Sequence, residues 1–137
     1  MLEVVRPPMA ETILVVGSNG INENSVIWNL LKADYQVRYA NDIGALSIIA
    51  IETPSAVLLT QESVKAQETC SSIRRVAPTV PILVIGRERD MDFKVKLFQA
   101  DADYLLEPFD TAELIARIRS AVRRSHPREH LTIERRG

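Results

Sequence analysis

The chain has 137 residues, of which 46% are apolar and 26% are charged, and its net charge is −1 at neutral pH. These values are typical of one globular domain and exclude a disordered chain, a collagen-like chain and a disulfide scaffold, since Cys70 is the only cysteine. No apolar run approaches the roughly 20 residues that span a bilayer, and residues 1–8 lack the pattern of a signal peptide. We therefore expect a cytoplasmic protein that does not enter a membrane.

The charge is unevenly distributed along the chain. Residues 117–137 hold seven arginines and two glutamates, a net charge of +5, whereas residues 1–116 hold ten basic and sixteen acidic residues, a net charge of −6. An acidic body followed by a basic tail suggests a change of role near the end of the chain. We expect an N-terminal extension at 1–11, one folded domain at 12–125 and a basic linker or tail at 126–137.

Short apolar runs alternate with longer segments of helical spacing. The apolar runs lie at 12–16, 36–40, 56–59, 81–85 and 104–106 and predict strands buried on both faces. Apolar residues at helical spacing predict helices around 27–31, 46–50, 73–77 and 114–122, and Phe93, Lys96 and Leu97 at i, i+3 and i+4 mark a further helix. This alternation predicts an α/β fold, a three-layer doubly wound parallel sheet of five strands with the order 2-1-3-4-5.

Ligands and chemistry in such a sheet are expected at the carboxyl ends of the strands. The residues at these ends, which we call the strand-end site, are Gly17, Ser18, Thr60, Gly86 and Glu107. Gly17 and Ser18 form either a plain tight turn or a turn whose backbone N–H groups bind an anion. A small ligand at this site stays open as an alternative, since most of these side chains are small.

Residues 12–124 resemble the receiver domain of bacterial two-component response regulators, which has a CheY-like, flavodoxin-like fold. The resemblance is best at 13–16, 54–59 and 81–85, and above all in Ala-Asp-Tyr-Leu-Leu-Glu-Pro-Phe at 102–109 and in 113–119. These last segments look most like the winged-helix (OmpR/PhoB-type) transcription regulators. In that subfamily a basic linker joins the receiver to a DNA-binding domain, so residues 126–137 would be this linker or the start of a missing winged helix.

The resemblance stops at the residues that carry the family's chemistry. The two acidic Mg²⁺ ligands correspond to Gly17 and Ser18, the phospho-accepting aspartate to Thr60, the phosphate-sensing Ser or Thr to Gly86, and the phosphate-pairing lysine to Glu107. An acyl phosphate needs a carboxylate nucleophile, and Mg²⁺ needs oxygen ligands. We therefore expect a pseudo-receiver with no phospho-acceptor, catalytic residue, metal or cofactor, which is not an enzyme.

Glu107 reverses the charge that the family places beside the phosphate. It is expected either to pair with Arg87 or Arg89 or to remain a solvated carboxylate. The resemblance also implies a cis peptide bond between Glu107 and Pro108, because the family has one there.

In the resembled subfamily, helix 4, strand 5 and helix 5 form a symmetric dimer face held by ion pairs. Asp103 and Arg117 match one such pair, whereas Glu113 faces Phe93 and Arg119 faces Phe98 at the other two. An apolar homodimer is therefore expected, with the alternative that the phenylalanines belong to the core. The expected interface residues are Phe93, Leu97, Phe98, Asp103, Glu113, Arg117 and Arg119.

Two functional hypotheses follow from these observations. The first is an atypical response regulator whose receiver dimerises without phosphorylation and controls transcription through a DNA-binding domain outside this chain. The second is a stand-alone pseudo-receiver that docks on a signalling partner, or a module that senses a small ligand.

Overall fold

The structure, a computed structural model, describes residues 11–17 and 23–124. Within these residues the strands are β1 (Thr12–Val16), β2 (Gln36–Ala40), β3 (Ala56–Leu59), β4 (Ile82–Gly86) and β5 (Ala102–Leu106). The helices are α1 (Glu23–Lys32), α2 (Asp42–Glu52), α3 (Ser63–Val76), α4 (Met91–Gln99) and α5 (Thr111–Arg124). Strands and helices alternate along the chain, as predicted.

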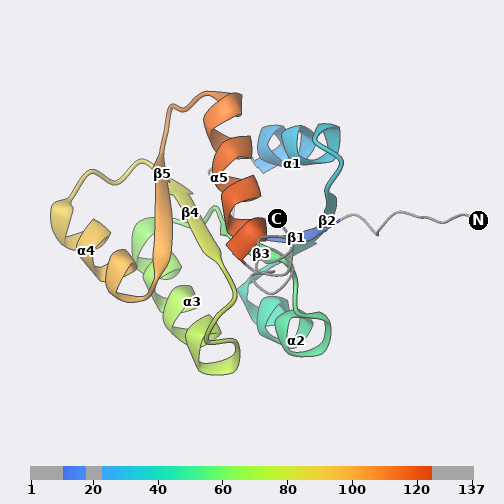
Figure 1. The fold of residues 1–137 in the computed structure, drawn as a ribbon. Coiled ribbons are helices and arrows are strands. Elements are labelled where there is room, and N and C mark those ends of the chain that lie inside the picture. Colours follow the sequence, from blue (N-terminus) through green and yellow to red (C-terminus); the bar gives the residue numbers. More distant parts are fainter. Residues whose placement is uncertain (1–10, 18–22, 125–137) are drawn as a thin grey trace, which may run out of the picture.

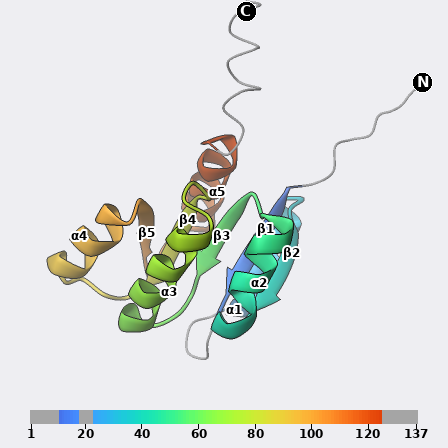
Figure 2. The same ribbon diagram turned by 90° about the horizontal axis from the view of Figure 1, so that it is seen from below.

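The five strands form one sheet in the order β2-β1-β3-β4-β5, and all neighbouring strands are parallel. This confirms the predicted doubly wound topology. Figure 2 shows β2 at one edge of the sheet and β5 at the other, with α4 beside β5. Every residue of β3 is buried, as predicted, but β2 and β5 are only partly buried, because an edge strand has a neighbouring strand on one side only.

Helices cover both faces of the sheet and create two hydrophobic cores. Leu14 and Val16 of β1 face one core, which contains apolar residues of α2, α3 and α4. Ile13 and Val15 face the other core, which contains apolar residues of α1 and α5, the two helices that lie side by side in Figure 1. A strand covered on both faces needs apolar side chains at successive positions, which explains the continuous apolar runs in the sequence.

Side-chain caps fix where several helices begin. The Asn41 side chain accepts a hydrogen bond from Gly44 N at 2.9 Å and so caps α2. Asp90 caps α4 in the same way through Asp92 N. β5 begins two residues earlier than predicted, because Ala102 also pairs with β4. None of the helices in the described segments is both long and apolar enough to cross a bilayer.

Candidate functional site

The strand-end site lies at the carboxyl ends of β1, β3, β4 and β5, along one end of the sheet. The backbone of Thr60 donates to Val16 O at 3.0 Å, so the end of β3 is fixed beside the end of β1. The backbone of Glu107 donates to Gly86 O at 2.8 Å, which joins the ends of β5 and β4. Thus the structure brings the predicted site residues together at the carboxyl end of the sheet, except Ser18, which lies outside the described residues.

Thr60 occupies the end of β3 as a buried residue, with 1% of its surface exposed. Its hydroxyl lies 3.5 Å from Val16 O and donates to it. A hydroxyl so enclosed offers no open face to a phosphodonor, and it carries no carboxylate that could form an acyl phosphate. Thr60 therefore ends a strand and supports packing.

Gly17 continues the pairing between β1 and β2. Its backbone N–H donates to Ala40 O at 3.2 Å. The Gly17 N–H group is therefore already bonded within the sheet. The rest of the predicted turn, from Ser18 on, lies outside the described residues, so the choice between a plain turn and an anion-binding turn stays a prediction.

Gly86 leaves room for Tyr104 of the neighbouring strand. A Cβ atom at position 86 would lie 3.1 Å from Tyr104 Oη, closer than an ordinary van der Waals contact. The Tyr104 hydroxyl donates to Glu88 O at 3.0 Å, and its ring meets Phe93 edge-on with centroids 5.4 Å apart. Burial raises the pKa of Tyr104 above its usual value. The hydroxyl is therefore a neutral donor that ties β5 to the loop after β4.

Tyr104 is absent from the predicted site. The signal that could have revealed it is a glycine at the end of β4 together with a large aromatic residue on the adjacent edge strand. Its significance depends on where the tyrosine side chain points, and alternation along an edge strand does not determine this.

Glu107 forms an ion pair with Arg87, which follows β4. Arg87 Nε donates to Glu107 Oε1 at 3.0 Å, and the Glu107 side chain is only 13% exposed. The structure thus selects the paired alternative over the solvated carboxylate. The peptide bond between Glu107 and Pro108 is cis, as the resemblance implied. Because Arg87 is largely exposed, the pair contributes about 0–1 kcal/mol to stability.

Curated relatives are response regulators. MprA of Mycobacterium tuberculosis (strain ATCC 25618 / H37Rv) is 33% identical over 125 residues, which cover 88% of this chain and 54% of MprA. MprA of Mycobacterium sp. (strain KMS) is 34% identical with the same coverage. The chain thus spans about half the length of the curated relatives it matches. No family model matches the chain.

Solved structures agree with the fold and with these relatives. A crystal structure from Chloroflexus aurantiacus J-10-fl, described as a response regulator, is 28% identical with a TM-score of 0.74, covering 83% of this chain and 98% of that one. A CheY-like receiver domain protein from Methanospirillum hungatei JF-1 is 18% identical with a TM-score of 0.77, covering 88% and 99%, and supports the fold alone. The domain is a response regulator receiver domain.

The described residues at the strand ends of this receiver domain do not supply the ligands of the magnesium ion that the resembled family holds there. A similar structure, the receiver domain of the sensor histidine kinase PA1611 from Pseudomonas aeruginosa, holds magnesium in its active site cleft (21% identity, TM-score 0.67, 83% and 98% coverage). Here Gly17 has no side chain, the Thr60 hydroxyl is enclosed, and Glu107 is paired. In the described part of the chain, no group of three His, Cys, Asp or Glu side chains could hold a metal.

Gln61, next to Thr60, is an unpredicted feature of this site. It is buried, and its Oε1 atom has no hydrogen-bond partner among the described residues. One amide oxygen does not make a magnesium site, since Mg²⁺ requires a near-octahedral set of oxygens, usually with a carboxylate.

The α4–β5–α5 face of the receiver domain differs from its prediction at Phe93 and Leu97. Both side chains are buried and pack in the core with β4 and β5, so neither can form part of an interface. They lie four residues apart and therefore share the inner face of α4. The outer face carries Met91, Val95 and Phe98, all exposed, and we call these three residues the α4 stripe.

The predicted ionic residues of this face are paired within one chain. Arg117 Nη1 donates to Asp103 Oδ2 at 2.9 Å, and Arg117 Nη2 donates to Glu113 Oε2 at 3.2 Å. These three residues and Phe98 line a groove of about 390 Å³ between α4 and α5, over the edge of β5. We call it the β5 groove.

Arg119 does not belong to this face, which corrects another predicted interface residue. Two residues after Arg117 on the same helix, it points about 200° away around the axis. Its charge acts instead on Tyr35, the residue before β2. Burial raises the pKa of Tyr35, although Arg119 acts in the opposite direction.

Proposed function

We propose that this receiver domain works without phosphorylation and regulates by self-association. In this proposal it is not an enzyme, and it uses no metal or cofactor. The observation that carries the proposal is the replacement of the phospho-acceptor by Thr60, whose hydroxyl is buried and bonded to Val16 O. A receiver switch needs a nucleophile that can take up the phosphoryl group, and threonine at this position cannot form an acyl phosphate.

The remaining groups of the strand-end site support the same proposal. Glu107 would place a negative charge beside a bound phosphoryl group, and it already has a partner in Arg87. Two like charges at about 4 Å repel by roughly 4 kcal/mol at an intermediate dielectric. In this proposal the charge of Glu107 is balanced by Arg87, and the site needs no phosphoryl group.

Self-association is proposed to use the α4 stripe and the β5 groove. The stripe exposes three large apolar side chains on one helix face, and Phe98 is 78% exposed. Contiguous exposed apolar side chains are costly in water and are commonly covered by a partner, most simply a second copy related by a two-fold axis. The revised interface comprises Met91, Val95, Phe98, Asp103, Glu113 and Arg117.

We propose further that the dimer serves transcriptional control through a DNA-binding domain outside this chain. Support comes from the curated relatives, which are response regulators about twice as long as this chain. The basic composition after residue 117 suits a linker to such a domain. In this arrangement the fraction of dimer depends on protein concentration or on another input, because the phosphoryl switch is missing.

The phosphorylation part of the proposal can be tested by intact mass spectrometry. The domain is incubated with acetyl phosphate, with and without Mg²⁺, beside a receiver domain that keeps an aspartate at this position. We expect a phosphoryl adduct on the reference domain and none on this one. A Mg²⁺-dependent adduct here, at any residue of the strand-end site, would reject the proposal.

A second candidate function is docking on another signalling protein through α1. Trp28 is 61% exposed, and Leu31, three residues later on the same helix, is also exposed. Tryptophan is enriched at the contacts that dominate binding between proteins, and Leu31 extends the exposed apolar surface beside it. If docking is the function, the double substitution Trp28→Ala/Leu31→Ala will abolish signalling in the full-length protein while Phe98→Glu leaves it intact. The first proposal predicts the reverse.

A further inference from the structure

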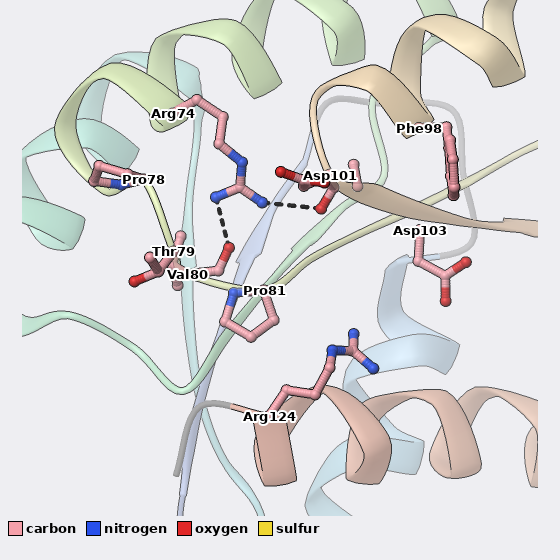
Figure 3. A pocket seen from close by; sticks show the side chains of 10 residues that line it. Arg74, Pro78, Thr79, Val80, Pro81, Phe98, Asp101, Asp103 and Arg124 are labelled. Atoms are coloured by element: carbon pink, nitrogen blue, oxygen red, sulfur yellow. Dashed lines mark hydrogen bonds between the residues drawn. The ribbon is translucent and has the colours of Figure 1, made fainter. Parts of the chain in front are cut away.

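Arg74 of α3 donates hydrogen bonds to four backbone carbonyls near the N-terminal ends of β4 and β5. Figure 3 draws the bonds to Val80 and Asp101. Its Nε donates to Ala100 O at 2.8 Å, and its Nη1 donates to Ala77 O at 3.1 Å and to Val80 O at 2.7 Å. Its Nη2 donates to Asp101 O at 3.0 Å. Four of the five N–H donors of the guanidinium are thus directed to the backbone.

These carbonyls belong to segments that are distant in sequence. Ala77 is the C-cap of α3, and Val80 precedes β4. Ala100 and Asp101 form the turn between α4 and β5. Asp101 has a φ of 57°, in the left-handed region that non-glycine residues seldom adopt. Such a conformation persists only where the surroundings hold it, and two of the four hydrogen bonds of Arg74 end on this turn.

The turn held by Arg74 lies between residues of the α4–β5–α5 face. Phe98 of the α4 stripe comes three residues before Asp101, and Asp103 comes two residues after it. A groove of about 510 Å³ lies here and is lined by Arg74, Phe98, Asp103 and Arg124, among others (Figure 3). It shares Phe98 and Asp103 with the β5 groove, so the position of the turn determines the shape of both grooves.

We infer that Arg74 is a positioning residue for self-association, although it lies on α3 and not on α4, β5 or α5. It fixes the α4–β5 turn to α3 and thereby holds Phe98 and Asp103 where a second copy meets them. This inference rests on the proposed function, because it requires the α4–β5–α5 face to be the interface.

The test compares Arg74→Met with two matched controls by sedimentation equilibrium. Methionine keeps much of the length of the side chain but donates no hydrogen bond. Arg75→Met removes the neighbouring arginine, whose Nη2 donates to the Ser72 hydroxyl of its own helix at 3.3 Å. Ile73→Val shortens a buried core side chain on the same helix and lowers stability while it leaves the four hydrogen bonds of the Arg74 side chain in place. We expect Arg74→Met to weaken the dimer by about tenfold or more, and both controls to dimerise like the parent.

Hydrogen exchange of the segment 98–104, measured on dilute monomer, gives a second readout. We expect Arg74→Met to accelerate exchange there, while Ile73→Val and Arg75→Met leave it unchanged. If Arg74→Met does not fold, Arg74→Lys retains a cation able to reach part of this carbonyl set and should give an intermediate dimer affinity.

The outcomes separate this inference from the function on which it rests. A parent domain that is monomeric at all concentrations overturns the self-association proposal, and with it the role of Arg74 in dimerisation. A dimeric parent whose Arg74→Met variant dimerises with unchanged affinity, or no more weakly than Ile73→Val, overturns the inference alone.

Discussion

Single residues decide what the strand-end site can do. Thr60, Gly86 and Glu107 stand where the resembled family has its acceptor, sensor and lysine, and each is already accommodated by a neighbour. Thr60 is enclosed beside Val16, and Glu107 is paired with Arg87. Tyr104 fills the space over Gly86 and bonds to the loop after β4. The hydrogen bonds and ion pairs of these residues are thus made within the domain, with no added phosphoryl group.

A substitution at Gly86 tests whether the Tyr104 side chain needs a residue without a Cβ atom beside it. Gly86→Ala places a Cβ atom 3.1 Å from Tyr104 Oη, so the hydroxyl must move and its bond to Glu88 O weakens. We expect the free energy of unfolding, measured in urea, to fall by about 1 kcal/mol. In a Tyr104→Phe background, which lacks that bond, the same substitution should cost less.

Gly44→Ala is the matched control. The added Cβ atom lies within α2 and meets its nearest neighbour, Asn41 Oδ1, at an ordinary 3.6 Å. Because alanine favours a helix more than glycine, stability should stay unchanged or rise by up to about 1 kcal/mol. If Gly86→Ala changes the free energy of unfolding no more than Gly44→Ala does, the placement of the Tyr104 side chain does not depend on the missing Cβ atom at position 86.

Cys70 gives a pH-dependent prediction. The thiol is buried in the core, and burial raises its pKa from 9.0 to about 11. In the unfolded chain the thiol loses its proton near pH 9, so between about pH 9 and 11 the folded state binds more protons and stability falls as pH rises. Cys70 lowers the free energy of unfolding by at most about 1.4 kcal/mol for each pH unit in this range. Below pH 9 the thiol is protonated in both states, and its contribution to stability no longer changes with pH.

Denaturant unfolding at pH 8, 9 and 10 measures this effect, with Cys70→Ala as the control. The variant should lose less stability between pH 9 and 10 than the parent, although the pKa values of Tyr35 and Tyr104 are also raised and leave a residual slope. Equal slopes for the two proteins would contradict the assignment to Cys70. The native thiol should also resist thiol reagents until the chain unfolds.

At the scale of elements, α4 separates a core face from an exposed face. Phe93 lies in the core and meets Tyr104 edge-on, whereas Phe98 stands out of the opposite side. The sequence predicted the helix but left the role of both phenylalanines open, because either side of α4 offers a plausible apolar stripe. Positions 93 and 97 define one side, and positions 91, 95 and 98 define the other. Only the placement of α4 against β5 decides between them.

These two phenylalanines make a matched pair on one helix. Phe93→Ala removes a buried ring and should lower the free energy of unfolding by about 3–5 kcal/mol. Phe98→Ala removes an exposed ring and should change it by no more than about 0.5 kcal/mol. In sedimentation equilibrium Phe98→Glu should shift the domain to monomer while its stability stays close to that of the parent. If Phe98→Glu dimerises as strongly as the parent, the proposed interface is wrong.

At the scale of the whole molecule, the topology was predictable because it follows from general rules. Alternating short apolar runs and amphipathic segments imply parallel strands with right-handed crossovers, and the observed sheet order follows. The same rules bring the ends of strands to one edge, so Thr60, Gly86 and Glu107 could be assigned to one site before their contacts were known.

Contacts that depend on side-chain direction could not be predicted in this way. Arg74 joins segments up to 27 positions away, and no periodicity in the sequence marks it. Arg117 turned out to bond Asp103 and Glu113 within its own chain. The spacing of charges along a sequence does not distinguish a pair within one molecule from a pair between two. Such contacts arise only when separate helices are packed on the same sheet.

The proposal as a whole predicts a dimer that is indifferent to phosphoryl mimics. A ligand shifts an equilibrium between two states only through a difference in its affinity for them, and a ligand that binds neither state shifts nothing. We expect beryllofluoride with Mg²⁺ to leave the dimer dissociation constant of this domain unchanged in sedimentation equilibrium. A receiver domain with an intact aspartate serves as the positive control, and Phe98→Glu gives the monomer reference. Tighter dimerisation on addition of beryllofluoride, lost again when Mg²⁺ is chelated, would mean that the strand ends still bind a phosphoryl group.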